Sequence, residues 1–236
     1  MPTGSDRCDD GVVERLGDLV WTDVDGRRPI LVVPVGSIEQ HGPHLPLDTD
    51  TRIAVAVASR VVARRTDCVL GPTIPIGASG EHGGFDGTLS IGTDALATML
   101  VELVRSADAF AGTVVVNGHG GNHDALRRVQ ELSATEGRRV LVWSPSIPGA
   151  DAHAGRTETS LLLAIDPSCV RTGAIAPGVT APLGELLDRL RSDGVRAVTS
   201  TGVLGDPTGA TADEGTRLLN GMIDDLVDRL TSWSTP

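Results

Sequence analysis

The chain alternates short, continuously apolar segments with longer segments whose apolar residues recur at helical spacing. Four short runs have the length and composition of buried strands: residues 30–35, 68–76, 113–117 and 140–143. Five amphipathic segments separate or follow them: residues 51–65, 93–109, 122–136, 157–165 and 210–233. Such alternation favours crossover connections between parallel strands. The pattern therefore predicts a three-layer α/β/α fold with a mostly parallel, doubly wound sheet.

Local signals refine these expected elements. The prolines in residues 68–76 place that strand near an edge of the sheet. We expect Asp48, Thr49 or Asp50 to cap the helix after the first strand. Thr93 and Asn122 are expected to cap the next two helices. The predicted organisation is a polar N-terminal tail, residues 1–15, followed by a single domain, residues 16–236.

Composition narrows the classes of partner. The chain has 236 residues and a formal net charge of −11, which disfavours binding to nucleic acid. No apolar run approaches the ~20 residues that span a bilayer, so we expect no membrane segment. Cys8, Cys68 and Cys169 are widely spaced, which argues against a disulfide framework or a thiolate zinc site. Together with the absence of an apolar signal-peptide core, this predicts a cytoplasmic protein.

The chain contains no lysine and no tyrosine, and all of its basic residues besides histidine are arginines. This removes Schiff-base lysines, P-loop lysines and tyrosine general acids from consideration. No Gly-x-Gly-x-x-Gly motif with a suitably spaced acidic residue follows a strand, so dinucleotide binding is not supported. Histidines and carboxylates are the main groups left for chemistry.

Histidines and carboxylates cluster where predicted strands end or helices begin. Three clusters share this placement: Glu39, His41 and Asp50; His119 and His123; His153 and Glu158. The carboxyl ends of parallel strands lie at one edge of a sheet, so we expect the clusters to converge. Imidazole and carboxylate together suit zinc or ferrous iron. Glycine-rich loops around them favour a reachable, catalytic ion over a closed structural one.

The motifs resemble those of the creatininase family. Residues 36–46 with Asp50, and the segment NGHGGN at 117–122, are similar to the family's two signature motifs. Further matches lie at residues 81–90, 153–160 and 205–211, so the resemblance covers about residues 16–230. It implies a metal-dependent amidohydrolase with one or two divalent ions per subunit, zinc or Fe(II) with manganese possible. It also implies a homo-oligomer, with a hexamer favoured.

Within the family, residues 79–82 and the chain length look most like a branch of peptidases that trim a ribosomally made, modified precursor peptide. That branch releases a C-terminal unit derived from Val-Tyr. The alternatives are a cyclic-amide or formamide hydrolase that acts on a small molecule, and a metal-binding protein without catalytic activity.

The resemblance assigns ligands position by position. Glu39 and His119 would bind one metal, His41 the other, and Asp50 would bridge both. Creatinine-cleaving members carry a further glutamate at the position of Gly121, which puts creatinine in doubt as the substrate. Glu158 is expected to replace that glutamate.

The catalytic candidates are His153 and Glu158. An imidazole titrates near neutral pH, so His153 suits proton transfer to the leaving amine, and the alternative is a hydrogen bond that supports the site. We expect Glu81, His82, His123 and Arg156 to contact substrate or support the ligands. The competing interpretations are an inert loop for Glu81 and His82, a helix start for His123, and a surface ion pair for Arg156.

Overall fold

Four parallel strands form the centre of the computed structural model, which describes residues 11–234. They are β1 (Ile30–Val35), β2 (Cys68–Leu70), β3 (Gly112–Asn117) and β4 (Val140–Trp143), in the order β2-β1-β3-β4. Ile30 lies opposite Cys68 on one side and opposite Gly112 on the other. The predicted parallel, doubly wound sheet is therefore confirmed, and β2 is an edge strand as expected.

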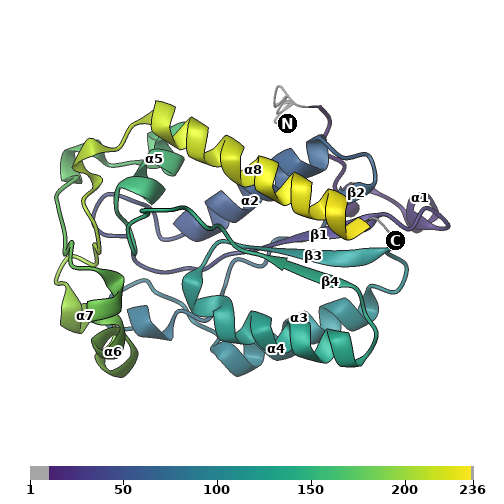
Figure 1. Ribbon diagram of the computed structural model, residues 1–236, viewed down its shortest axis with the longest axis horizontal. Helices are drawn as coiled ribbons and strands as arrows, with labels where there is room; N and C mark the ends of the chain where they lie inside the picture. The colour runs from purple at the N-terminus through teal and green to yellow at the C-terminus, as the bar shows by residue number, and fades with distance from the viewer. Residues whose placement is uncertain (1–10, 235–236) are drawn as a thin grey trace.

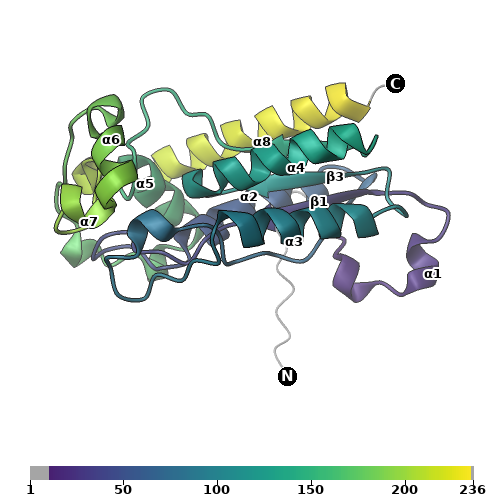
Figure 2. The same ribbon diagram turned by 90° about the horizontal axis from the view of Figure 1, so that it is seen from below.

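Helices cover both faces of this sheet (Figure 1). One face carries α2 (Thr49–Ala63), α5 (Arg156–Ile165) and α8 (Ala212–Ser234). The other carries α3 (Thr93–Ser106) and α4 (His123–Thr135), which Figure 2 shows side by side. Residues of β1 alternate between the two cores, since Ile30 and Val32 join the first and Leu31 and Val33 the second. Period-two alternation thus explains why a fully buried strand serves two layers.

The remaining helices are short and lie at the two ends of the sheet. α1 (Trp21–Val24) lies at the end where β1 begins, whereas α6 (Leu183–Asp193) and α7 (Val195–Val198) lie beyond the strands' carboxyl ends (Figure 1). Short 3-10 turns occupy the loops: Leu16–Asp18, Gly80–His82, Gly120–Asn122, Pro167–Cys169, Thr172–Ala174 and Pro207–Gly209. Within residues 11–234, no helix combines the length and apolar character needed to cross a membrane.

Some predicted details differ from the structure. The second strand ends at Leu70 instead of reaching residue 76, and beyond it Ile74 makes only an isolated bridge to Val35. Prolines and a glycine in this stretch interrupt regular pairing. Near the N-terminus, the main-chain oxygen of Glu14 accepts from the main-chain nitrogen of Leu70. Part of the expected tail therefore pairs with the edge strand β2. Residues 1–10 of that tail, with Cys8, lie outside the described residues.

The expected helix caps are also wrong in chemistry, although close in position. Asp48 occupies the N-cap of α2, but its side chain accepts from Arg52 Nε at 2.7 Å instead of capping the helix. Thr93 is the first residue of α3, after Gly92. Asn122 precedes α4 without a capping hydrogen bond, because its side chain is used elsewhere.

Candidate metal centre

The loop after β1 and the first turn of α2 bring the first three candidate residues together. A Cβ at Gly36 would lie 2.3–2.6 Å from atoms of Thr51, so glycine there allows the strand end to meet the helix start. His41 Nε2 consequently lies 3.0 Å from Asp50 Oδ1, and Ser37 Oγ donates to Asp50 Oδ2 at 2.7 Å. Hydrogen bonds from this loop therefore fix the orientation of the Asp50 carboxylate.

The loop after β3 adds His119 from the neighbouring strand. A Cβ at Gly118 would lie 2.3 Å from the main-chain oxygen of Asp50, so this loop also needs glycine to approach. His119 Nδ1 lies 3.1 Å from Asp50 Oδ2, and its Nε2 lies 3.1 Å from Glu39 Oε2. The adjacency of β1 and β3 in the sheet is what makes these contacts possible.

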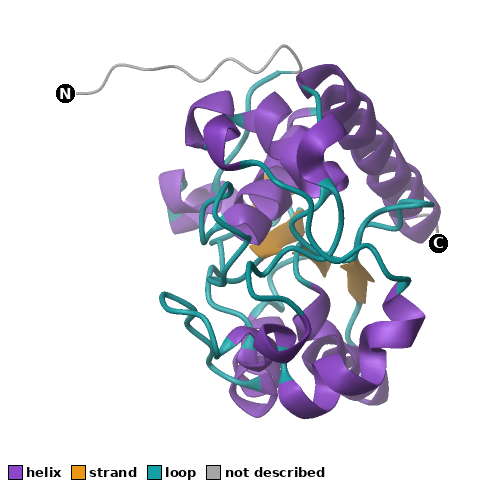
Figure 3. Ribbon diagram, turned by 90° about the vertical axis from the view of Figure 1, so that its left-hand side faces the viewer, coloured by secondary structure: helices purple, strands orange, loops and turns teal. Residues whose placement is uncertain are grey.

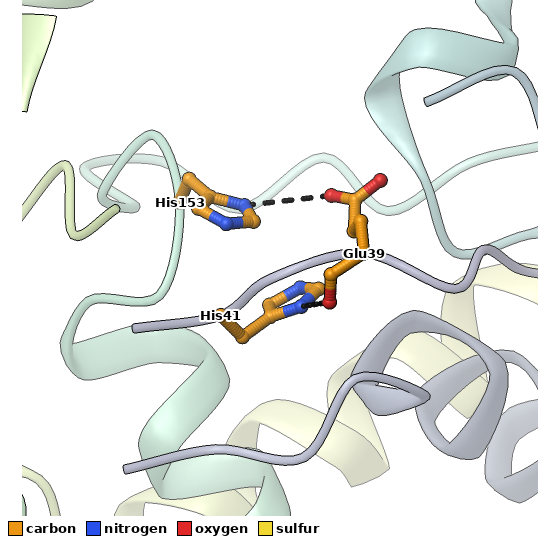
Figure 4. A group of neighbouring side chains, drawn as sticks. All are labelled: Glu39, His41 and His153. Atoms are coloured by element: carbon orange, nitrogen blue, oxygen red, sulfur yellow. Dashed lines mark hydrogen bonds and ion pairs between the residues drawn. The ribbon is translucent and has the colours of Figure 1, made fainter. Parts of the chain in front are cut away.

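The loop before α5 supplies His153, and the first turn of α5 supplies Glu158. In Figure 4 the His153 ring faces the Glu39 carboxylate, 3.8 Å from Nδ1 to Oε1, while His41 binds the main-chain oxygen of Glu39. Glu158 Oε2 accepts from the main-chain nitrogen of Ala154 at 2.5 Å and lies 4.0 Å from His41 Nε2. Ala154 adopts a φ of 52°, a strained conformation for a non-glycine residue that occurs at functional loops.

These side chains form three overlapping groups in which one ligand atom from each residue lies within 4.8 Å of the others: Glu39, Asp50 and His119; His41, Asp50 and Glu158; Glu39, His41 and His153. Asp50 belongs to the first two groups. A carboxylate shared in this way can bridge two cations. The convergence expected from the strand ends is therefore present in the fold.

The Glu39 carboxylate provides the test of whether a cation fits. It is fully buried, and among the side chains that the structure describes neither of its oxygens has a hydrogen-bond partner. A buried carboxylate without such partners is costly unless a cation compensates it. His41 donates Nδ1–H to the main-chain oxygen of Glu39 at 3.1 Å, which leaves Nε2 for a cation, as metal-binding histidines commonly do. The residues therefore fit a divalent metal.

Electrostatics within the protein agree with this interpretation. Burial, with the nearby Asp50 charge, raises the pKa of Glu39 to about 8. Burial disfavours the charged forms of Asp50 and His41 too, but their mutual attraction prevails. It holds the pKa of Asp50 well below its ordinary value and raises the pKa of His41 to about 10. Without a metal, the buried carboxylates and imidazoles therefore hold protons that a divalent cation would displace.

Glu81 and His82 lie against this centre. Glu81 Oε1 lies 3.4 Å from His119 Nε2, and His82 Nε2 lies 3.3 Å from Glu39 Oε1. A Cβ at Gly121 would lie 2.4 Å from Glu81 Oε1. The glycine therefore makes room for the Glu81 carboxylate next to His119.

His123 and Arg156 lie farther out. His123 is exposed at the start of α4 and lines the cavity described below. Arg156 is exposed and makes an ion pair with Glu214, 2.7 Å from Nε to Oε2. The structure thus shows the surface ion pair that was the alternative interpretation of Arg156. Arg156 lines a separate hollow beside Asp206.

A cavity of about 940 Å³ opens over the centre at the carboxyl edge of the sheet. Figure 3 looks onto this side, where loops crowd around the strand ends. Glu39, Asp50 and His119 line it together with His153 and Glu158, and residues 187–196 of α6 and α7 line another part. The centre is therefore reachable from solvent, as the glycine-rich loops predicted.

Sequence reasoning missed two residues that organise the centre. Asn122 donates to the main-chain oxygen of Gly36 and to Asn117 Oδ1, at 3.1 and 3.0 Å, and accepts from Ala78 at 2.8 Å. It ties together three loops at the carboxyl edge of the sheet. Gln40 contacts two of the candidate histidines. The signal for Gln40 was its position between two predicted ligands in one motif.

The fold is an open parallel α/β sheet, and imidazole and carboxylate groups that can hold a metal adjoin its carboxyl edge. These two features place the chain in the class of α/β proteins with a candidate metal centre. The family model described as creatininase, creatinine amidohydrolase, matches residues 17–230. The chain belongs to the creatininase family of hydrolases, which confirms the resemblance seen in the motifs.

Relatives and solved structures agree with this membership. The chain is 55% identical over 225 residues to a mycofactocin precursor peptide peptidase from Mycolicibacterium smegmatis, covering 92% of this chain and 91% of that protein. It is 51% identical over 233 residues to the protein of that name from Mycobacterium tuberculosis, covering 94% and 92%. A mutant creatininase of the Zn-Zn type has the same fold, with a TM-score of 0.81, 24% identity and coverage of 96% and 100%.

Proposed function

We propose that the chain is a metal-dependent peptidase that cleaves the modified mycofactocin precursor peptide and releases its C-terminal Val-Tyr-derived unit. The observation that carries this proposal is the 55% identity, over nearly the whole chain, to a protein named for that substrate. The family membership and the cluster of buried carboxylates and imidazoles support hydrolysis of an amide bond.

The cavity supports a peptide substrate. Its volume of about 940 Å³ lies at the upper end of the roughly 300–1,000 Å³ typical of ligand pockets, far more than a single small ring needs. Arg191 and Arg196 line it on the side of α6 and α7, which provides room for further residues of a peptide. A small lactam would leave this part of the cavity unused.

Glu39, Asp50 and His119 would hold one divalent ion, and His41, Asp50 and Glu158 a second. Zinc or Fe(II), with manganese as a further candidate, suits this mixture of ligands. Such an ion, when bound, supplies hydroxide near neutral pH and polarises the carbonyl of an amide. The protein's part is to keep the ligands buried and oriented, through Ser37 for Asp50 and the main chain for His41.

His153 is the candidate for moving the proton that the leaving amine requires. Burial, followed by the nearby His41 and His82 rings, lowers its pKa well below the ordinary value, so the ring is neutral at pH 7. A neutral imidazole accepts a proton first and then donates it to the amine. Glu158 remains a candidate for both ligand and catalytic roles, and Glu81, His82 and His123 are proposed to support the ligands or contact the peptide.

The test incubates the full-length protein, loaded separately with Zn²⁺, Fe²⁺ or Mn²⁺, with modified and unmodified precursor peptide. Mass spectrometry should detect the C-terminal unit only from the modified peptide. Glu39→Gln should abolish release and reduce the metal content, whereas Glu131→Gln on the exposed face of α4 should behave as wild type.

The alternatives give different results. Hydrolysis of a cyclic amide or formamide without cleavage of the modified peptide would identify a small-molecule hydrolase and overturn the proposal. A full complement of bound metal with no turnover of any amide would identify a non-catalytic metal-binding protein.

We further propose a homo-oligomer, with a hexamer favoured, and a cytoplasmic location. The family resemblance supports the first and the composition supports the second. Light scattering of the purified protein, in which a monomer of 24.5 kDa would contradict the oligomer, tests the assembly.

A further inference from the structure

We propose that Gln40 is a positioning residue that sets which ring nitrogen of His82 carries the proton, while its main-chain oxygen does the same for His153. The two rings lie next to each other, with centroids 4.5 Å apart, and both face the Glu39 carboxylate. Gln40 is 5% exposed and lies on the side of these rings away from that carboxylate. For its catalytic consequence, this inference rests on the proposed function.

Main-chain partners fix the orientation of the Gln40 amide. Oε1 accepts from the main-chain nitrogen of Gly42 at 2.9 Å, and Nε2 donates to the main-chain oxygen of Gly202 at 3.2 Å. A main-chain N–H can only donate and a carbonyl oxygen can only accept, so the reversed amide would oppose both contacts. The Nε2 group therefore has one hydrogen left for a histidine.

His153 cannot take this hydrogen. Its Nε2 lies 2.7 Å from the main-chain oxygen of Gln40, which only accepts, so Nε2 must carry a proton. A protonated Nε2 is not an acceptor for the Gln40 amide, although the two nitrogens lie 3.0 Å apart. The neutral His153 ring consequently has its lone pair on Nδ1, the atom 3.8 Å from Glu39 Oε1.

His82 is then the acceptor for the second amide hydrogen. Its Nδ1 lies 2.9 Å from Gln40 Nε2, so Nδ1 must carry a lone pair and the ring proton must reside on Nε2. That Nε2–H lies on the Glu39 side of the ring, 3.3 Å from Oε1. The two adjacent imidazoles therefore turn different atoms toward the Glu39 carboxylate. His82 turns its protonated Nε2, and His153 turns its unprotonated Nδ1.

This arrangement decides which nitrogen of His153 takes part in catalysis. Nδ1 can accept and return a proton over the centre, because Nε2–H is hydrogen-bonded to the main-chain oxygen of Gln40. The His82 N–H meanwhile lies near the Glu39 carboxylate, with Nε2 3.3 Å from Oε1. Gly202 belongs to this arrangement, since a Cβ there would lie 1.6 Å from Gln40 Oε1.

The experiment measures ¹⁵N shifts of histidine-labelled full-length protein in its Zn²⁺ form, without substrate. Wild type should show His82 and His153 both protonated at Nε2 and unprotonated at Nδ1. In Gln40→Glu the new carboxyl oxygen can only accept from His82, so His82 should move its proton to Nδ1 while His153 stays unchanged. Gln40→Met should leave His82 as a mixture. The exposed Gln130→Met, on α4, is the matched control.

Activity gives a second readout. Gln40→Met should lower kcat by about 10–100-fold, the usual effect of losing a residue that orients a metal-site side chain, with little change in KM. His82 protonated at Nδ1 in the wild type, or a Gln40→Glu tautomer that matches wild type, would overturn the inference. The tautomers are read without peptide, so failure to cleave the peptide would count against the proposed function alone.

Discussion

Gly121 offers a sharp test of how the centre is built. Replacement by alanine would place a Cβ 2.3 Å from His119 Nε2 and 2.4 Å from Glu81 Oε1. The same Cβ would lie 2.5 Å from the main-chain oxygen of Ala78. Since an ordinary contact begins at 3.4 Å, relief requires a movement of 3.4 − 2.5 = 0.9 Å even at the main-chain atom. Rotation of one flexible side chain cannot resolve the clash.

The movement has a predictable cost for the metal. Both nitrogens of His119 lie 3.1 Å from carboxylate oxygens, one of Glu39 and one of Asp50. Relief at His119 Nε2 requires 3.4 − 2.3 = 1.1 Å, which disrupts both relationships. Loss of ligand orientation of this kind lowers metal affinity by about 10–100-fold. A misplacement of about 1 Å near the chemistry also lowers kcat/KM by about 100-fold.

Chelator competition gives the metal affinity of Gly121→Ala, and mass spectrometry of peptide release gives kcat/KM. Gly120→Ala is the matched control, because a Cβ at the neighbouring glycine meets nothing within 4 Å. Wild-type affinity in Gly121→Ala would refute the argument, as would an equal loss in Gly120→Ala.

Three further predictions concern the ligands and one the surface. Asp50→Asn should remove both ions by elemental analysis, whereas Glu158→Gln should retain about one of the two, because only Asp50 belongs to both groups. Since the pKa of His41 is raised to about 10, a metal must displace its proton, so affinity should rise at least about tenfold per unit between pH 6 and 8 in a competition titration. At a metal concentration about 100 times Kd, chelation should remove about 2.7 kcal/mol of stability, or roughly 5–10 °C in Tm by calorimetry. Arg156→Ala should leave kcat/KM unchanged, because its partner is Glu214 and it lies outside the main cavity.

The sheet and the meeting of the clusters could be predicted because they follow from local patterns and one topological rule. A continuous apolar run marks β1, and parallel strands bring their carboxyl ends together whatever the loops do. Glu39 follows β1, and Asp50 lies in the first turn of α2, 50 − 39 = 11 residues later, so one loop accounts for their proximity. Which ions these residues bind stays a prediction.

The missed features depend on partners far away in the sequence. The partner of the Arg156 ion pair, Glu214, lies on a different helix, and Gln40 meets Gly202 through a contact between loops that carry no periodic pattern. The Asn122 side chain ties loops from three parts of the chain, so a capping rule based on its immediate neighbours gave the wrong partner. Propensity describes what a residue can bond locally, and tertiary contacts decide which option is used.

The glycine at position 121 also bears on substrate choice. The side chain of a glutamate there would begin in space that Glu81 and His119 now occupy, because its Cβ would lie 2.4 Å from Glu81 Oε1 and 2.3 Å from His119 Nε2. In this chain carboxylates come to the centre from the loop at Glu81 and from α5 at Glu158, whereas the loop after β3 carries none. Gly118, Gly120 and Gly121 all line the cavity, so part of that side of the centre presents backbone between the side chains of His119 and His123. A wall of this kind can accept an extended peptide, whose own backbone needs room and hydrogen-bonding groups alongside the bond to be cleaved.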